Sequence, residues 1–410
     1  MNILVAAMFG GDSQNPKIMR ILCSEWEKQG HKVVRFFPCL TQSIYEEQKK
    51  NQNTYPFMLP EMSCYDDILH QLVLNRKSIL AMTKLVLRHP FFFFEFLIRR
   101  IPVIDDFLGK PGKIQKEIQK VCKRTKFDLI IVGSNPFFLA LGASKANCSP
   151  RKIWYQMDPH ADNGMIRSKK IKREHLAELF VFEHMDKIFV QPNSYMAIVN
   201  KLKAPVAEKV SPTNFPLVNP NVSVTANFFH FEKGTINCVY AGALMLPIRR
   251  PEYMFRLFSL FKNQKIHLYV WCGNLTEDKK NEMIAMMPPN VTYCGSLPQI
   301  EMQSVLAGAD LLVSLGNTVV NQLPSKLLDY ISLRKPIINI YKTDECPTRQ
   351  ILSGYPLSVS VSEAEDVSEA ASKVEEFILD KYGQREDPNM IREKYHDYLP
   401  EVVAEYVLNA

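Results

Sequence analysis

Short runs of apolar residues recur along the chain, and each run ends in glycine, proline or polar turn residues. Between the first two runs, apolar positions follow a helical period from Pro16 to Gln29, and Gly30 is placed to end that helix. Continuous apolar runs separated by helices are typical of parallel strands that are buried on both faces. The first half carries six such runs: NILVAAM (2–8), HKVVRFFP (31–38), FDLIIVGSNP (127–136), RKIWYQMD (151–158), DKIFVQPN (186–193) and EKVSPTNFP (208–216).

The same rhythm restarts after a polar, irregular stretch at 219–234. Six more apolar runs follow: INCVYAG (236–242), KIHLYVWCG (265–273), VTYCG (291–295), ADLLVSLGN (309–317), KPIINIY (335–341) and PLSVSV (356–361). We therefore predict an α/β protein with two doubly wound Rossmann-like domains that face each other across a cleft. The expected N-terminal domain spans 1–219 and is completed by 388–410, a linker spans 220–234, and the C-terminal domain spans 235–387. The last segment is helical in pattern with a break at Pro400, and we expect it to return to the first domain.

Composition places the chain among soluble globular proteins, with 46% hydrophobic and 23% charged residues over 410 positions. A chain of this length usually divides into domains, each with its own hydrophobic core. The nine cysteines are odd in number and contain no CxxC pair, which argues against a disulfide framework or a zinc site and indicates a reducing compartment. The first residues lack the features of a signal peptide, and no run of about 18 uncharged apolar residues is present. We expect a cytoplasmic protein.

The net charge of +7 is unevenly spread, with thirteen Lys and Arg against four Asp and Glu between Arg76 and Lys126. The segment LVLRHPFFFFEFLIRRIP (85–102) combines aromatic residues with Arg88, Arg99 and Arg100. Such a segment fits either an interfacial element on an anionic membrane surface or a buried core helix. No nucleic-acid-binding module is recognisable, so we expect no nucleic-acid partner.

Ligands of open parallel sheets bind beyond the carboxyl ends of the strands, so the loops after the strands are the candidate sites. Gly10 and Gly11 follow the first run without forming the GxGxxG fingerprint, and they predict either a tight turn or a close backbone approach to a ligand. In the second half, Gly242 ends one run shortly before Arg249, whose guanidinium suits phosphate oxygens. Glycine also directly follows two further runs, at Gly273 and Gly295.

The stretch NQLPSKLLDYISLRKPII (321–338) joins a polar loop to a helix that begins at Pro324. A helix N-terminus offers free N–H groups and positive potential, which suit a diphosphate. On a helical period Leu327, Leu328 and Ile331 form the buried stripe, and Lys326, Asp329 and Tyr330 lie on the other side. Asp329 could reach a ribose, or it could form a surface ion pair with Lys326.

This stretch resembles the C-terminal signature of GT-B glycosyltransferases, in particular the family 4-like retaining group, in which an acidic pair E-x7-E precedes a G-x-P-V-I strand. Asp329 matches the second, ribose-binding acidic position, and Asn321 stands where the first Glu would be. The form PSKLLDYISLRKPII is closest to the variant of bacterial polysaccharide-assembly transferases, with Arg334 in place of a glycine. VYAGAL (239–244) resembles the family's Y-x-G-R-L, VTYCGSLPQIEM (291–302) its V-x-F-x-G loop, and KVSPTNFPLV (209–218) its I-P-N-G-V segment.

The resemblance implies a glycosyltransferase that moves a sugar with retention from a UDP- or GDP-sugar to a saccharide or polyprenyl-linked acceptor in surface polysaccharide synthesis. It implies no metal cofactor, so DPHAD (158–162) is not interpreted as a metal motif. Peripheral attachment to the inner face of the plasma membrane would suit a lipid-linked acceptor. The expected catalytic residues are His160, Asp158 and Asn321, and the acceptor-side loop holds Gly10 and Gly11. The expected donor-binding residues are Gly242, Arg249, Gly273, Gly295, Ser296, Leu297, Pro324, Ser325, Lys326 and Asp329.

Three alternatives stay open from the sequence. A lone histidine such as His160 is often structural. Asn321 and Ala243 depart from the family pattern and would suit a catalytically degenerate GT-B scaffold protein. A sugar-nucleotide epimerase shares the fold but requires its own carboxylates and histidines.

Overall fold

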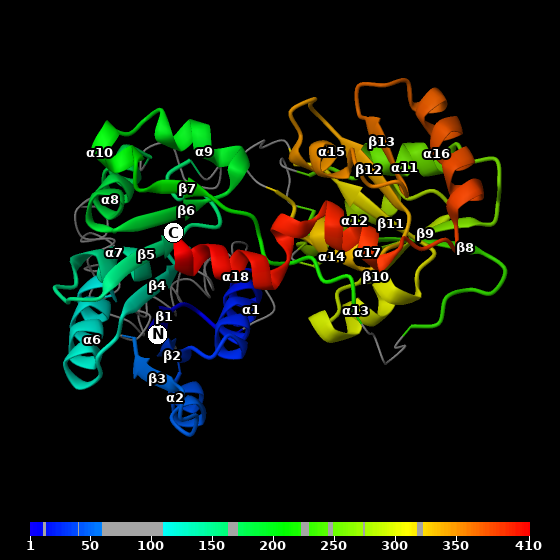
Figure 1. Ribbon diagram of the computed structural model, residues 1–410. Coiled ribbons are helices and arrows are strands. Elements are labelled where there is room, and N and C mark those ends of the chain that lie inside the picture. The colour runs from blue at the N-terminus through cyan, green and yellow to red at the C-terminus, as the bar shows by residue number, and fades with distance from the viewer. Residues whose placement is uncertain are drawn as a thin grey trace, which may run out of the picture. The chain divides into compact units, whose positions relative to one another are not determined.

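The computed structural model describes residues 1–10, 14–39, 41–59, 110–162, 171–222, 229–244, 249–273, 275–317 and 323–410. The chain forms two compact units, which are described separately below (Figure 1). The first consists of Met1–Thr213 together with Ala404–Ala410, and the second of Asn214–Val403.

Within its described residues, the first unit builds a seven-stranded sheet in the order β3-β2-β1-β4-β5-β6-β7, with all neighbouring strands parallel. The order reverses between β1 and β4, which is the doubly wound arrangement. The strands are β1 (Asn2–Ala6), β2 (Lys32–Cys39), β3 (Thr54–Met58), β4 (Leu129–Gly133), β5 (Arg151–Tyr155), β6 (Lys187–Val190) and β7 (Val210–Pro212).

Helices connect these strands, and α6 and α7 pack side by side (Figure 1). The central strands are buried along nearly their whole length, as parallel strands covered on both faces must be. The helices are α1 (Gln14–Lys28), α2 (Gln42–Gln48), α6 (Lys110–Arg124), α7 (Phe138–Lys145), α8 (Ile171–His184), α9 (Pro192–Val199) and α10 (Ala204–Ala207).

The second unit builds a six-stranded parallel sheet from its described residues, in the order β10-β9-β8-β11-β12-β13. Its strands are β8 (Ile236–Ala241), β9 (Ile266–Trp271), β10 (Val291–Gly295), β11 (Leu311–Leu315), β12 (Ile337–Tyr341) and β13 (Ser358–Ser362). Its helices are α11 (Glu252–Ser259), α12 (Glu277–Ala285), α13 (Gln299–Gly308), α14 (Lys326–Ser332), α15 (Pro347–Leu352), α16 (Val367–Lys381) and α17 (Pro388–Lys394).

The C-terminal segment returns to the first unit. A 3-10 turn (His396–Tyr398) follows α17, and Pro400 then begins α18 (Pro400–Asn409), so the chain breaks its helix where the sequence predicts. The indole Nε1 of Trp26 on α1 donates to the carbonyl of Ala404 at 2.9 Å, and the Tyr406 ring packs against Phe189 with centroids 5.6 Å apart. Figure 1 shows α18 (red) beside α1 (blue).

The predicted fold class, two doubly wound α/β domains with a returning C-terminal helix, is confirmed. Each of the twelve apolar runs named above forms a strand, β1, β2 and β4 to β13. The sequence interpretation missed β3, whose residues TYPFM contain Pro56. Proline lacks an amide donor and is tolerated in edge strands, and β3 is an edge strand of the sheet that the described residues form.

No helix among the described residues is long and apolar enough to cross a membrane. The segment 85–102, with Arg88, Arg99 and Arg100, lies outside the part of the chain that the structure describes.

Candidate functional site

Four neighbouring strands of the second sheet end in glycine. Gly242, Gly273 and Gly316 follow β8, β9 and β11 directly or after one residue, and Gly295 is the last residue of β10. Space is also tight at Gly242, where an added Cβ would lie 2.8 Å from the hydroxyl of Tyr240 and 3.7 Å from a terminal nitrogen of Arg249. The carboxyl edge of this sheet is therefore lined by bare backbone with one arginine beside it.

Arg249 joins the loops that follow β8 and β11. Its Nε donates to Oδ1 of Asn317 at 2.7 Å, and its Nη1 lies 3.5 Å from the carbonyl of Ala243. Asn317 is 4% exposed, so the guanidinium is held against a buried amide. A guanidinium fixed in this way presents a rigid set of donors suited to phosphate oxygens.

Two buried tyrosines, Tyr240 and Tyr330, pack next to the end of β8. The Tyr330 hydroxyl lies 3.2 Å from both the amide nitrogen and the carbonyl oxygen of Ala241, which ties α14 to the end of β8. Burial raises the pKa of Tyr330, and burial raises that of Tyr240 to about 12 although Arg249 opposes the shift. Both phenols therefore stay protonated at neutral pH.

The prediction that Tyr330 lies on the polar side of its helix is wrong. Its side chain is 2% exposed and buried together with Leu327, Leu328 and Ile331. A tyrosine is amphipathic, and a helical period cannot say whether its hydroxyl will find a buried partner. Here the backbone of Ala241 supplies that partner.

The helix α14 begins at Lys326, two residues later than the sequence predicts. Pro324 and Ser325 form a preceding turn, because their carbonyls accept from Leu327 and Leu328 at 2.9 and 3.1 Å. Pro324 is buried, and Ser325, Lys326 and Asp329 are half-buried.

The ends of β9 and β10 lie side by side. The amide of Cys272 donates to the carbonyl of Gly295 at 2.8 Å, and the Tyr293 hydroxyl donates to the carbonyl of Cys272 at 3.1 Å. A Cβ on Gly273 would lie 3.3 Å from Cβ of Ser296. Ser296 is exposed and the adjoining Leu297 is half-buried.

The structure thus brings together Gly242 with Arg249, and Gly273 with Gly295 and Ser296. Sequence reasoning missed Asn317, which anchors Arg249; its signal was the polar residue right after the strand and glycine of SLGN (314–317). Gly10 is exposed in the loop after β1, and Gly11 and Asn321 lie in stretches that the structure does not describe.

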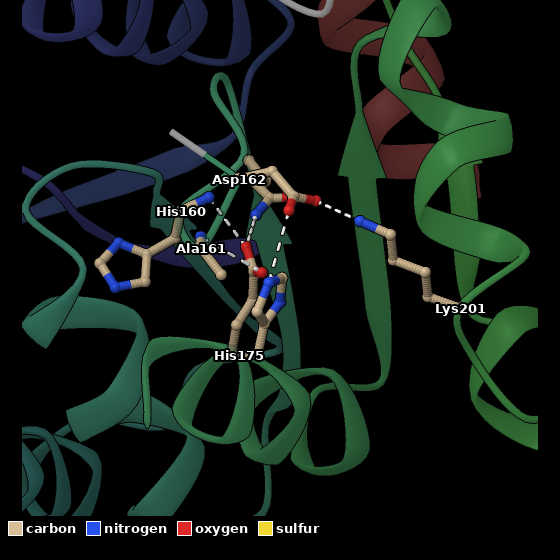
Figure 2. A network of polar contacts seen from close by, with 7 residues as sticks. His160, Ala161, Asp162, His175 and Lys201 are labelled. Atoms are coloured by element: carbon tan, nitrogen blue, oxygen red, sulfur yellow. Dashed lines mark hydrogen bonds and ion pairs between the residues drawn. The ribbon is translucent and has the colours of Figure 1, made fainter. Parts of the chain in front are cut away.

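His160 in the first unit lies in the loop after β5 (Figure 2), and two buried glutamates of α8 contact it. Its Nε2 lies 2.8 Å from Oε2 of Glu174, and its backbone N–H donates to Oε1 of Glu178 at 2.8 Å. The imidazole also stacks on the ring of Phe137 with centroids 3.8 Å apart. An Nε2–H donated to an ionised Glu174 leaves the lone pair of a neutral imidazole on Nδ1.

The rest of the loop is anchored on both sides of His160. The Asp158 amide lies 3.5 Å from the hydroxyl of Ser134. Asp162 accepts from Nζ of Lys201 at 2.6 Å and lies 3.5 Å from Nε2 of His175, as Figure 2 shows. Contacts at Asp158 and Asp162 thus hold the loop on either side of His160.

Burial dominates the electrostatics of this loop. It raises the pKa of Asp158, and it raises the pKa of Glu178 although the backbone N–H of His160 stabilises the ionised form. Sequence reasoning missed Glu174 and Glu178. Their spacing of four residues puts both carboxylates on one face of α8, which is the signal that could have found them.

The search for metal ligands covers only the described residues. Among them, no group of three or more His, Cys, Asp or Glu side chains could hold a metal ion.

No protein-family model matches the chain, and no curated protein matches its sequence. Solved structures do match. Anabaena HepE in complex with UDP superposes with a TM-score of 0.63 at 11% identity, covering 100% of this chain and 99% of HepE. The lipopolysaccharide outer core galactosyltransferase WaaB gives a TM-score of 0.57 at 12% identity, covering 100% of this chain and 98% of WaaB.

A Listeria monocytogenes protein named as a UDP-N-acetylglucosamine 2-epimerase also matches, with a TM-score of 0.53 at 9% identity over 99% of this chain and 94% of that protein. These neighbours share a two-unit α/β architecture with the present chain over nearly its whole length. The chain has the GT-B fold.

Proposed function

We propose that the protein is a glycosyltransferase that uses a nucleotide-diphosphate sugar as its donor. The observation that carries this proposal is the Arg249–Asn317 pair, 2.7 Å apart, at the glycine-lined carboxyl edge of the second sheet. In open α/β sheets this edge is where nucleotides bind. HepE, which shares the fold, has been solved with UDP and with UDP-glucose.

In this proposal Arg249 contacts the diphosphate, and the backbone at Gly242, Gly273, Gly295, Ser296 and Leu297 lies against the nucleotide. Pro324, Ser325 and Lys326 contribute the turn that opens α14, and Asp329 binds the ribose. A uridine or a guanosine would each be compatible with a site formed mainly by backbone groups.

In the first unit, His160 and Asp158 would take part in catalysis, and Gly10 and Gly11 would lie on the acceptor side. In the second unit, Asn321 would lie near the donor sugar. Transfer would proceed with retention of configuration to a saccharide, in the lipid-linked case during surface polysaccharide assembly. A polyprenyl-linked acceptor would call for attachment to the cytoplasmic face of a membrane through the basic segment at 85–102. The protein would act by positioning the substrates and stabilising the leaving diphosphate without a metal ion.

The experiment is to incubate the protein with UDP- and GDP-sugars, with and without saccharide and polyprenyl-phosphate acceptors, in the presence of EDTA. We expect donor binding by calorimetry, and a glycoside product whose anomeric configuration by NMR equals that of the donor. Loss of activity in EDTA would reject the metal-independent mechanism, and a product of opposite configuration would reject retention.

The alternatives give different results in the same experiment. An epimerase, which the fold of the Listeria protein keeps open, would convert the nucleotide sugar to its epimer without an acceptor. A degenerate scaffold would bind the donor and give neither transfer nor hydrolysis. In that case Asp329→Ala would leave donor binding unchanged. Absence of binding to every nucleotide sugar tested would reject the proposal.

A further inference from the structure

Two half-buried cysteines face each other at the edge of the first unit opposite to the carboxyl ends of its strands. Cys122 lies near the end of α6, and Cys148 lies in the loop between α7 and β5. Since α6 precedes β4 and this loop precedes β5, both residues belong to the amino edge of the sheet. This edge is the one opposite to the loop of His160, which follows β5.

One face of α6 is fastened along this loop. Nε2 of Gln115 donates to the carbonyl of Lys145 at 2.9 Å, and Nε2 of Gln119 donates to the carbonyl of Asn147 at 3.4 Å. Cys122 occupies the next position on the same face, about one turn further along. It therefore lies beside the next loop residue, Cys148, and each thiol is the main influence on the pKa of the other.

The surroundings of Cys148 favour its thiolate. The Cys122 thiol donates toward it, and this interaction is the largest cause that lowers the pKa of Cys148 to about 7. Burial and Asp186 oppose the shift, whereas Lys152 supports it. The Lys152 ammonium is held over the loop, 3.2 Å from the carbonyl of Ala146. Cys122 keeps its proton, because the same interaction and burial raise its pKa.

Other described cysteines have the opposite character. Burial raises the pKa of Cys294 to about 11 and that of Cys23 to about 12. Cys294 is also half-buried, so the contrast between it and Cys148 is one of chemistry rather than of access.

We propose that Cys122 and Cys148 form a reversible redox pair, in which Cys148 is the attacking thiol and Cys122 the resolving thiol, with low-molecular-weight disulfides such as glutathione disulfide as the oxidant. The Cys148 thiolate attacks one sulfur of glutathione disulfide and releases one glutathione thiolate. Cys122 then loses its proton and attacks the Cys148 sulfur of the mixed disulfide, which releases the second glutathione. The protein loses two thiol hydrogens and two electrons, and glutathione disulfide gains them as two thiols.

The product would link α6 to the loop before β5. This pair does not depend on nucleotide binding, so its test is independent of the proposed transferase activity.

The test equilibrates the full chain with reduced and oxidised glutathione at increasing oxidised fraction. Samples are quenched with acid, alkylated with N-ethylmaleimide, digested and analysed by mass spectrometry. We expect a peptide pair joined through Cys122 and Cys148 before any adduct forms at Cys294, and its loss on treatment with dithiothreitol. In Cys122→Ser, which lacks the resolving thiol, glutathione is expected to accumulate on Cys148. Cys294→Ser, the matched control, should give the wild-type joined peptide.

Reactivity provides a second readout that requires no disulfide. At pH 7 Cys148 is expected to react with iodoacetamide at least about ten-fold faster than Cys294, since its larger thiolate fraction outweighs its lower intrinsic nucleophilicity. Equal rates would overturn the assignment of Cys148 as the attacking thiol. A wild-type protein that carries only a glutathione adduct on Cys148, as Cys122→Ser does, would overturn the pairing.

Discussion

The imidazole of His160 lies 2.8 Å from the carboxylate of Glu174, which is 6% exposed on the neighbouring helix α8. A buried carboxylate fixes both the orientation and the tautomer of a histidine, as in the histidine–carboxylate pairs of many enzymes. His160 is therefore not isolated, and whether the pair serves catalysis or structure is decided by substituting Glu174.

Glu174→Gln is expected to reduce sugar transfer about ten- to hundred-fold while leaving nucleotide-sugar affinity within about two-fold. The amide is nearly isosteric but carries no charge to hold the Nε2 proton. His160→Ala should lower the rate similarly, and the double variant should be no slower than His160→Ala alone, because Glu174 acts through His160. The measurement is kcat and KM for each variant with donor and acceptor.

Glu183→Gln is the matched control, since Glu183 is exposed on the same helix. A Glu174→Gln variant that keeps the wild-type rate would show that the pair is structural.

Asn317→Ala is expected to weaken nucleotide binding about three- to ten-fold, because Arg249 loses the acceptor that fixes its Nε. Asn317→Asp should weaken it further, about ten- to hundred-fold, because a carboxylate beside the guanidinium competes with phosphate. Calorimetric titration with UDP measures both. Arg250→Ala provides the control, as Arg250 is exposed beside Arg249. Equal affinities for the Asn317→Asp variant and the wild-type protein would place the phosphates elsewhere.

The apolar runs of the sequence predicted the sheets well, because strands that are buried on both faces consist of nearly continuous apolar residues. The strand β3 gave no such signal, since Pro56 stands in it and only one of its edges pairs with a strand of the described residues. Side-chain partners over long sequence separations were equally inaccessible. The 2.7 Å contact of Arg249 with Asn317 and the bond of Tyr330 to Ala241 depend on which strands lie side by side.

Arg334 illustrates how tertiary contacts override a local rule. It has φ of 59°, a left-handed conformation that usually favours glycine, at the end of α14. The Nη1 of Arg334 donates to the carbonyl of Glu386 at 2.9 Å, and the Glu386 amide donates to the carbonyl of Arg334 at 2.9 Å. The sequence showed the departure from glycine, and it could not show the loop that compensates for it.

Gly142→Ala should destabilise the first unit by about 1–3 kcal/mol. An added Cβ would lie 2.5 Å from Cβ of Ile114 and 2.8 Å from the carbonyl of Pro111, so α7 must move away from α6. The control is Gly112→Ala on α6, where no atom lies within 4 Å of an added Cβ and the change should stabilise by up to about 1 kcal/mol. Urea denaturation measures both, and equal effects of the two substitutions would contradict the close packing of these helices.

The stability of the wild-type protein is expected to rise between about pH 8 and pH 10.5 relative to Lys335→Met. Lys335 is 5% exposed, its Nζ donates to the carbonyl of Ala309, and burial lowers its pKa from 10.5 to about 8, with Arg385 adding to the shift. Below pH 8 lysine is protonated in both the folded and the unfolded state, so the full cost of the buried charge is present. Between the two pKa values only the unfolded state binds the proton, so each unit of pH adds stability to the folded lysine form, up to about 3 kcal/mol in total.

The measurement is the difference in unfolding free energy between the two proteins, from urea titrations at about pH 7.5, 8.5 and 9.5, which begin below the lower pKa and end within the interval. Other titrating groups cancel in that difference. Lys373→Met is the control for removing a lysine as such, because Lys373 also donates to a backbone carbonyl, that of Ser360 at 3.1 Å, but is exposed. If the difference in unfolding free energy between wild type and Lys335→Met stays constant across these pH values, Lys335 keeps its proton in the folded protein, and the prediction is wrong.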